Sequence, residues 1–308
     1  MFPYILIPCI VDMSNKGCYR GGMKLINKTG LPDSFLNFAE KDPYSKGHAD
    51  FSVTQLIDSP KISQLQEENN AELEVDVADR VWALMGTAVH SILEGGAGPD
   101  DIVEERIFVT VNGKVVSGAV DVLTPIGDSY EMDDYKLTRA WSVMADKPEW
   151  EKQLNTYRVM LHMNGKKIDS LNIIAIIRDW SAKKAQFDRN YPQKPIIKIE
   201  IPIWPLDKAE AFLLERVTLH SASRAASEPF PCIDIERWTR PERYAVMKKG
   251  TKRALKIWPT RKDAERYAGE CRIKFTGDYF VEERPAEHVR CEGNYCQVNQ
   301  WCNQWGKS

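Results

Sequence analysis

The stretch from Tyr130 to Lys136 (YEMDDYK) places three acids, two tyrosines and a lysine within seven residues. Side chains two residues apart in a β-strand point to the same face of a sheet. Asp134 and Lys136 would therefore share one face of a strand, and Glu131 and Asp133 would share the other. A carboxylate beside an ammonium group suits metal-assisted hydrolysis, whereas a solvated, charged strand is the alternative.

A second carboxylate that could join this site is Asp121, which lies in the apolar run SGAVDVL. A buried carboxylate is costly unless it is paired or binds a metal. We expect Asp121 and Asp134 to converge on Mg²⁺ or Mn²⁺, which prefer hard oxygen ligands. Lys136 would then orient a metal-bound water or stabilise developing negative charge. Taken alone, Asp121 could equally be a strand-end residue in a salt bridge.

The surrounding periodicity predicts helices and strands that would position these residues. The dipeptide Asn112-Gly113 predicts a hairpin turn between two strands. The six acids between Glu67 and Asp79, with no base among them, predict a solvated loop or face. We expect helices at 52–68 (interrupted near Pro60), 76–96, 147–165 and 206–226, and strands at 102–113, 114–127, 129–138, 170–180 and 195–204. This order predicts an α/β (α+β) core with a mixed central sheet flanked by helices.

Four short motifs occur in a fixed order along these elements. The pattern resembles the PD-(D/E)XK nuclease superfamily, in particular the RecB-like and phage exonuclease branch that includes the CRISPR-adaptation nucleases. The resemblance covers about residues 52 to 180 and implies a restriction-endonuclease-like core. The motifs are GTAVH with His90, SGAVD with Asp121, DYK with Asp134 and Lys136, and QLNTY with Gln153 and Tyr157.

The resemblance also implies a role for each of these residues. Metal binding would fall to His90, Asp121, Asp134 and the backbone carbonyl of Tyr135. Lys136 would be the catalytic lysine. Gln153 and Tyr157 would contact that lysine or the DNA strand.

Three of the seven cysteines, Cys291, Cys296 and Cys302, lie within the last 18 residues. This spacing favours a metal or cluster site over three buried thiols. The resemblance would place the fourth ligand at Ser59, which is not a cysteine. We expect Cys232 to be the fourth ligand instead, because it opens the region that the three cysteines close, with Cys271 as the second choice. The resemblance favours a [4Fe-4S] cluster; a structural Zn²⁺ is the alternative. Either group would hold the C-terminal tail against the core.

The segment from Arg240 to Arg266 is strongly basic, with ten Lys/Arg against three Asp/Glu, in a chain of net charge -2. This excess predicts contacts to nucleic-acid phosphates, and a nearby aromatic residue could stack on unpaired bases. An ordinary charged hairpin and helix is the alternative. The residues expected to contact DNA are Lys248, Lys249, Lys252, Arg253, Lys256 and Trp258.

Composition divides the chain into three predicted parts. Residues 1–22 are expected to be an upstream start or a disordered leader, because Met23 opens a plausible alternative beginning. Residues 23–228 would form the nuclease core, and residues 229–308 a basic hairpin-helix module closed by the cysteine site. No run of about 18 apolar residues is present, so no membrane contact and a cytoplasmic location (host cytoplasm if phage-encoded) are expected.

These features together predict a Mg²⁺- or Mn²⁺-dependent deoxyribonuclease. We expect an exonuclease that acts on single- or double-stranded DNA ends in phage or mobile-element replication, recombination or repair. Phage recombination or replication proteins would be its partners. The alternative is a non-cleaving nucleic-acid-binding or assembly factor on a nuclease fold.

Overall fold

A computed structural model describes residues 11–12, 17–20, 23–40 and 47–305 of the 308-residue chain. The chain forms two compact units that divide between Phe230 and Pro231, against a predicted boundary near residue 229. Most of the predicted leader lies outside the described residues. Within it, the backbone of β1 (Val11–Asp12) and β2 (Gly17–Arg20) forms strands. Among the described residues, no helix combines the length and apolarity that crossing a membrane requires.

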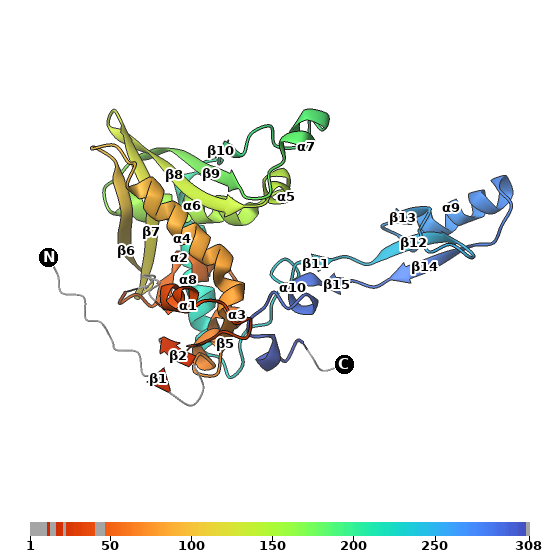
Figure 1. Cartoon of the computed structure of the whole chain (residues 1–308), viewed down its shortest axis with the longest axis horizontal. Coiled ribbons are helices and arrows are strands. Elements are labelled where there is room, and N and C mark those ends of the chain that lie inside the picture. Colours follow the sequence, from red (N-terminus) through yellow and green to blue (C-terminus); the bar gives the residue numbers. More distant parts are fainter. Residues whose placement is uncertain (1–10, 13–16, 21–22, 41–46, 306–308) are drawn as a thin grey trace. The chain divides into compact units, whose positions relative to one another are not determined.

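The first unit is built around a mixed six-stranded sheet in the order β10-β9-β8-β7-β4, with β6 paired to β7 (Figure 1). Pairs β6–β7, β7–β8 and β9–β10 are antiparallel, whereas β8–β9 and β4–β7 are parallel. The predicted mixed central sheet is therefore present. Its strands are β4 (Phe51–Ser52), β6 (Ile102–Val111), β7 (Lys114–Ile126), β8 (Ser129–Thr138), β9 (Ile168–Ile177) and β10 (Ile196–Glu200).

Helices flank this sheet on both faces. One face packs against α6 (Pro148–Met163), which in turn contacts α2 (Val53–Ile57) and α8 (Leu206–Ala225). The other packs against α4 (Val81–Glu94), which lies over β7 and β8 (Figure 1). The short helices α5 (Ala140–Met144) and α7 (Ala182–Phe187) follow the ends of β8 and β9.

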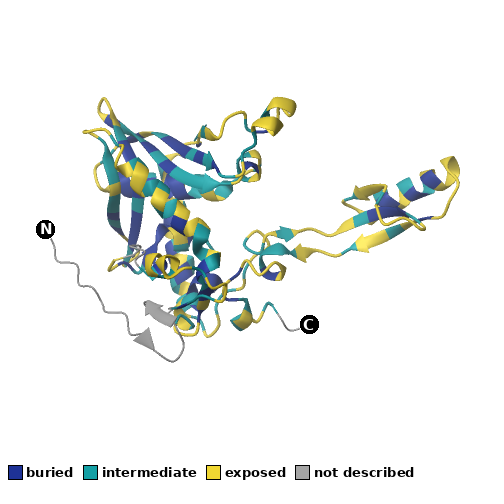
Figure 2. Cartoon of the chain, in the orientation of Figure 1, coloured by how far each residue is buried: buried dark blue, intermediate teal, exposed yellow. Residues whose placement is uncertain are grey.

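The main core lies between the sheet and α6, where side chains of both are almost fully buried (Figure 2). Leu123, Met132 and Ile173 supply it from three neighbouring strands, and Leu154 and Leu161 supply it from α6. Full burial of each such side chain stabilises the folded state by roughly 1.5–3 kcal/mol relative to leaving it exposed. This packing fixes the positions of β7 and β8, which carry the expected site.

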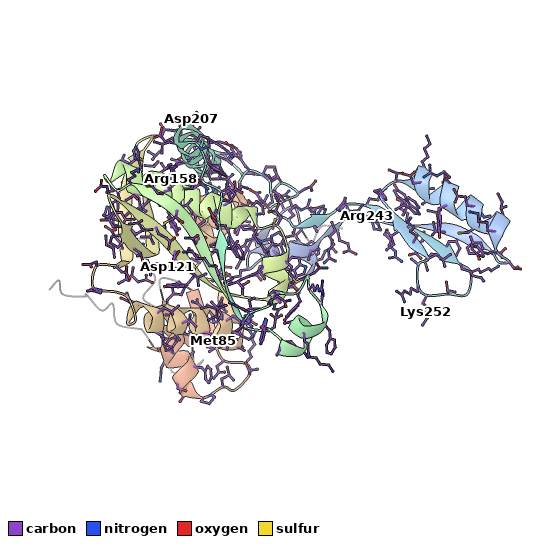
Figure 3. All side chains as sticks on the ribbon, turned by 90° about the horizontal axis from the view of Figure 1, so that it is seen from above. Met85, Asp121, Arg158, Asp207, Arg243 and Lys252 are labelled. Atoms are coloured by element: carbon purple, nitrogen blue, oxygen red, sulfur yellow. The ribbon has the colours of Figure 1, made fainter. Side chains whose placement is uncertain are left out.

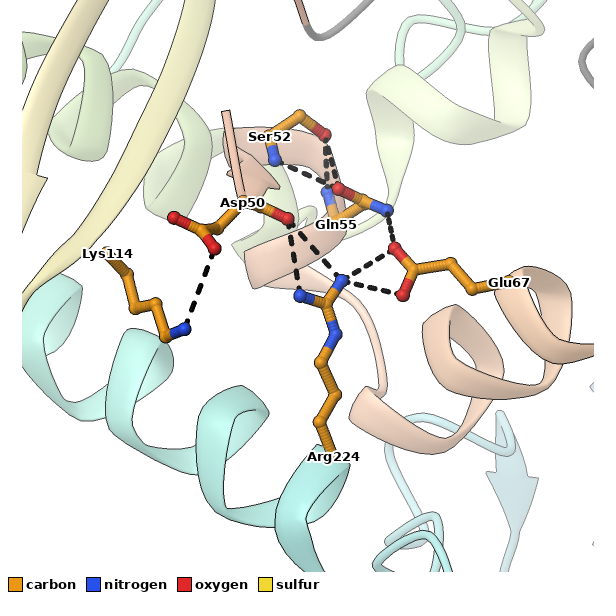
Figure 4. A network of polar contacts seen from close by, with 6 residues as sticks. All are labelled: Asp50, Ser52, Gln55, Glu67, Lys114 and Arg224. Carbon is orange, nitrogen blue, oxygen red and sulfur yellow. Dashed lines mark hydrogen bonds and ion pairs between the residues drawn. The ribbon is translucent and has the colours of Figure 1, made fainter. Parts of the chain in front are cut away.

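A polar network fastens α2, α8 and the start of β7 to α3 (Pro60–Glu68) (Figure 4). Arg224 donates to both carboxylate oxygens of Glu67 at 2.6 and 2.7 Å and to the backbone oxygen of Asp50 at 3.4 Å. Gln55 donates to Glu67 at 3.3 Å and forms a capping box with Ser52 at the start of α2. The break near Pro60 is present, because α2 ends before the proline that opens α3.

A small second sheet has the order β1-β2-β3-β5. It includes β3 (Met23–Ile26), which pairs in parallel with β5 (Glu74–Asp76). The acidic stretch was expected to be a solvated loop or face, yet part of it is this strand, in which Val75 is buried. After β5 come a 3₁₀ helix (Val77–Arg80), capped by Asp76, and α4; the helix α1 (Asp33–Glu40) contacts β3.

The second unit contains a three-stranded antiparallel sheet in the order β13-β12-β14. Helix α9 packs on this sheet, with Val246, Ala264 and Ala268 at the centre of the contact (Figure 2). A two-stranded pair, β11 with β15, leads into α10 and a final 3₁₀ turn. The elements are β11 (Thr239–Arg240), β12 (Arg243–Lys248), β13 (Lys256–Trp258), α9 (Arg261–Lys274), β14 (Tyr279–Arg284), β15 (Glu287–His288), α10 (Val289–Glu292) and the turn Asn299–Trp301.

Candidate metal centre

The β6–β7 hairpin places a glutamate opposite Asp121. The turn residues Asn112 and Gly113 both have positive φ (50° and 72°), as a two-residue hairpin turn with left-handed central residues requires. Pairing runs in constant register from this turn, but the ladder skips the position at which Glu104 faces Asp121. Glu104 itself has a φ of 49°, a left-handed conformation that is uncommon for a residue with a side chain. The irregular backbone therefore coincides with the expected site.

Strands β7 and β8 separate at the same point. Their last pair on this side is Val122 with Asp133. The backbone N–H of Tyr135 donates instead to the Asp121 carboxylate, at 2.7 Å from Oδ2. Asp121 thus occupies the fork between the two strands, where it is held by the backbone of β8.

His90 on α4 reaches this fork from the helix side. Its Nε2 lies 3.2 Å from the carbonyl oxygen of Tyr135. Its Nδ1 lies 3.5 Å from Glu104 Oε1 and 3.6 Å from Asp121 Oδ1. If Nε2 carries the proton and donates it to the carbonyl, the Nδ1 lone pair faces the two carboxylates. That tautomer presents a nitrogen and two oxygens to one point.

The ligand atoms of His90, Glu104 and Asp121 all lie within 4.8 Å of one another. Burial, and after it the negative charge of Asp134, raises the pKa of Asp121 to about 7, against the lowering effects of His90 and Lys136. The Glu104 carboxylate raises the pKa of His90, and the charge of Asp121 adds to this effect. Mutual repulsion and burial of the acids create a site that a cation would stabilise.

Asp134 and Lys136 form an ion pair beside this group, with 2.7 Å between Lys136 Nζ and Asp134 Oδ2. Asp134 is only 4% exposed. The ion pair lacks hydrogen-bond geometry, and among the described residues Oδ2 of Asp134 is a buried oxygen with no hydrogen bond. Asp134 is not within the group of three ligand atoms.

Glu131 and Asp133 point to the other face of β8. Lys198 donates to Glu131 at 2.7 Å and lies 3.7 Å from Asp133. Asn172 donates to Asp133 at 2.9 Å. The strand alternation expected from the sequence is therefore present, and it separates Asp134 and Lys136 from the two other acids.

Gln153 and Tyr157 lie one turn apart on α6, and Gln153 Nε2 donates to the Tyr157 hydroxyl at 3.1 Å. Both are buried, and Tyr157 belongs to the main core. Its ring packs so closely on β7 that a Cβ at Gly118 would lie 2.7 Å from Tyr157 Cε1. The absence of a side chain at Gly118 thus sets the position of Tyr157.

The four cysteines of the expected cluster all lie in the second unit. Burial raises the pKa of Cys296, and the nearby Cys291 and Cys302 thiols raise it further, so these three are neighbours. Cys232 is tied to the same tail by two hydrogen bonds with the Gln304 side chain, at 2.7 and 3.2 Å. Within the described part of the chain, however, no three sulfurs lie within 4.8 Å of one another. This spacing is wider than a tetrahedral Zn²⁺ site would have, with Zn–S bonds of about 2.3 Å.

The second choice for the fourth ligand, Cys271, lies on α9 and is 3% exposed. It follows Ala264 and Ala268 along the buried side of this helix. The structure therefore places Cys271 in a packing position.

The basic residues expected to contact DNA lie on β12, on β13 and on the loop that joins them. Four of them, Lys249, Lys252, Arg253 and Lys256, are exposed, and Lys248 is partly buried. Trp258 packs against Val246 and α9, with its ring centroid 5.7 Å from that of Tyr267. Trp258 thus contributes to packing, and the charged residues form the exposed surface.

Glu104 is the residue that the sequence analysis did not name. The signal for it was present: a two-residue turn at Asn112-Gly113 fixes the register of the hairpin and places Glu104 opposite Asp121. Its left-handed backbone could not be read from the sequence, because glutamate has no preference for that conformation.

Comparisons with known proteins leave the family open. No model of a known protein family matches the chain, and no curated protein matches it. Among solved structures, one titled "Crystal structure of SSO0001" is 17% identical with a TM-score of 0.42, over 61% of this chain and 85% of that chain. A structural similarity at this TM-score does not support any inference about function.

Proposed function

We propose that this chain is a metal-dependent deoxyribonuclease that hydrolyses phosphodiester bonds. The observation that carries the proposal is the convergence of His90, Glu104 and Asp121 at the fork between β7 and β8. The Asp134–Lys136 ion pair lies on the neighbouring positions of β8. A nitrogen, carboxylate oxygens and an adjacent ammonium are the groups that metal-assisted phosphodiester hydrolysis uses.

The residues present fit Mg²⁺ or Mn²⁺. Carboxylate oxygens suit both ions, and an imidazole nitrogen is a better ligand for Mn²⁺ than for Mg²⁺. Burial, and after it the charge of Asp134, raises the pKa of Asp121, and a bound cation would offset both effects. His90, Glu104 and Asp121 would hold the ion, and Asp134, whose Oδ2 is ion-paired with Lys136, would be a further ligand. When bound, the ion would lower the pKa of a coordinated water and polarise the phosphate.

The protein's own groups supply orientation and charge. With the proton on Nε2, His90 donates to the Tyr135 carbonyl and turns the Nδ1 lone pair to the carboxylates. The Lys136 side chain, 28% exposed, places a positive charge where a phosphate oxygen could approach it. This charge would favour the pentavalent transition state, in which negative charge on the phosphoryl oxygens increases. Gln153 and Tyr157 would support this arrangement from α6.

The proposal extends to exonuclease action on DNA ends in phage or mobile-element replication, recombination or repair. The exposed basic loop between β12 and β13 supports it, since Lys249, Lys252 and Arg253 could contact phosphates. The corresponding partners would be phage recombination or replication proteins, and the location would be the host cytoplasm.

We further propose that Cys232, Cys291, Cys296 and Cys302 hold a [4Fe-4S] cluster, with Zn²⁺ as the alternative. Three neighbouring thiols and a fourth cysteine tied to the same tail support this assignment. A cluster is larger than a single ion and holds its thiolates further apart.

The test is cleavage of linear and circular DNA, single- and double-stranded, with Mg²⁺ or Mn²⁺. Asp134→Ala and Lys136→Ala should each lower the cleavage rate by at least about a hundredfold, the scale of losing a group that stabilises the transition state. The matched control is Asp133→Ala, which removes the adjacent carboxylate on the other face and should retain most of the activity. Full activity in both test variants would reject the proposal, and binding without cleavage by the wild type would favour a non-cleaving factor.

A further inference from the structure

Two arginines lie side by side where β8 and β9 end. Arg139 follows the last residue of β8, and Arg178 follows the last residue of β9. The backbone N–H of Arg178 donates to the Thr138 carbonyl at 2.9 Å, which holds the two strand ends together. In the described structure, neither arginine has an ion pair. Asp179, the acid beside Arg178, uses Oδ1 to accept the backbone N–H of Ala140 at 2.7 Å.

Aromatic side chains flank this pair. The Arg178 guanidinium lies 3.6 Å from the centroid of the Trp82 ring on α4, and Trp82 is 47% exposed. Trp141 on α5 is 68% exposed, and Lys147 Nζ lies 5.0 Å from the centroid of the Trp141 ring. Lys147 Nζ also lies 3.9 Å from Glu149. Exposed aromatic side chains rimmed by charged residues often mark a ligand-binding surface. We name Trp82, Arg139, Trp141, Lys147 and Arg178 the strand-end surface.

Local packing holds this surface in place. Ala140 and Ile177 are buried in a small core with Tyr191, which Trp180 and Val143 border. The Tyr191 hydroxyl accepts the backbone N–H of Ser181, the residue that caps α7. The arginines and Trp141 are therefore attached to anchored backbone, so binding would require little ordering of the chain.

We propose that the strand-end surface binds unpaired nucleotides of a DNA strand next to the scissile phosphate. This inference rests on the proposed nuclease function and names its substrate as a single-stranded or frayed end. Guanidinium groups bind phosphate through paired hydrogen bonds, and indoles stack on the faces of unpaired bases. In a duplex the base faces are covered by neighbouring bases. A duplex could therefore bind the basic side chains through its phosphates but could not stack on the tryptophans.

The distance to the candidate metal centre suits this role. Arg139 follows Lys136 by three residues, which in extended chain is about 10 Å. A strand whose scissile phosphate lies at Lys136 would therefore pass the strand-end surface within a few nucleotides. Binding there would orient the strand and would favour cleavage of unpaired DNA.

The test uses the full-length protein and two readouts. Fluorescence anisotropy in Ca²⁺ would give the affinity for a labelled oligothymidine and for a blunt duplex of equal length. Turnover of bis(p-nitrophenyl) phosphate in Mn²⁺ would report the metal centre alone, because this small ester cannot span both sites. The variants are Trp141→Ala and Arg178→Gln. The matched control is Lys208→Ala, an exposed lysine 4.0 Å from the Trp204 ring.

Lys208 lies on α8, and in the view of Figure 3 its neighbour Asp207 and the α4 residue Met85 lie on opposite sides of Asp121. Trp141→Ala should weaken oligothymidine binding by about 5- to 150-fold, corresponding to one lost base stack. Its effect on duplex affinity and on ester turnover should be much smaller, and Lys208→Ala should change none of the three. Equal losses on both DNAs, or no loss on either, would overturn the inference. Absence of ester turnover in the wild type would instead refute the proposed function.

Discussion

The sharpest prediction concerns the pH dependence of metal binding, because burial and Asp134 together raise the pKa of Asp121 to about 7. A cation binds the ionised carboxylate, so protons compete with it below that pH. For a pKa of about 7, roughly one-tenth of Asp121 is ionised at pH 6 and roughly nine-tenths at pH 8. The apparent Kd for Mn²⁺ should therefore fall about tenfold between these two values. His90, whose pKa is also raised, must be neutral to bind and shifts the affinity in the same direction.

The assay is calorimetric titration with Mn²⁺ at pH 6 and pH 8, in two buffers with different ionisation enthalpies. The difference between buffers counts the protons released on binding, which should approach one or more at pH 6 and decline at pH 8. Asp121→Asn should abolish most of the binding. As a control, Asp169→Asn changes a carboxylate that is 53% exposed and paired with Lys167, and should leave the profile unaltered. A pH-independent Kd, or unchanged binding by Asp121→Asn, would refute the reasoning.

The remaining predictions concern stability and the cysteine site. Because the folded-state pKa of Asp121 lies above its ordinary value, its ionisation destabilises the metal-free fold as pH rises from about 4 to 7. Asp121→Asn should stabilise the metal-free protein at pH 8 by up to about 4 kcal/mol and by less at pH 5 in urea unfolding; a larger gain at acidic pH would contradict this. Gly118→Ala should cost about 1–3 kcal/mol, because its Cβ would meet the Tyr157 ring, whereas Gly86→Ala, with open space around it, should be neutral or stabilising. Cys291→Ser should lower the iron or zinc content measured in anaerobically purified protein, and a wild type without either metal would reject the cysteine site.

The parts of the fold that the sequence predicts are those with long periodic patterns or strong turn signals. Asn112-Gly113 predicts the hairpin, because both residues tolerate left-handed backbone. The alternation of Asp133 and Asp134 predicts their opposite faces, since a strand has a period of two. The short helices α5 and α7 carry too few residues to show a helical period.

Other features depend on contacts that local sequence does not encode. The strand β5 forms because its backbone pairs with β3, some 50 residues earlier in the chain. The local sequence does not show this pairing, and its acidic residues alone predict a loop. Glu104 enters the site through an irregular backbone position that long-range pairing imposes on β6. Tertiary structure thus overrides local preference at both positions.

We propose that a divalent cation binds at the fork between β7 and β8. Anomalous diffraction from crystals grown with Mn²⁺ tests this claim most directly. We predict a peak within coordination distance, about 2 Å, of His90 Nδ1 and of carboxylate oxygens from Asp121 and Glu104. A peak elsewhere, or none at this fork at a Mn²⁺ concentration that saturates cleavage, would contradict the account.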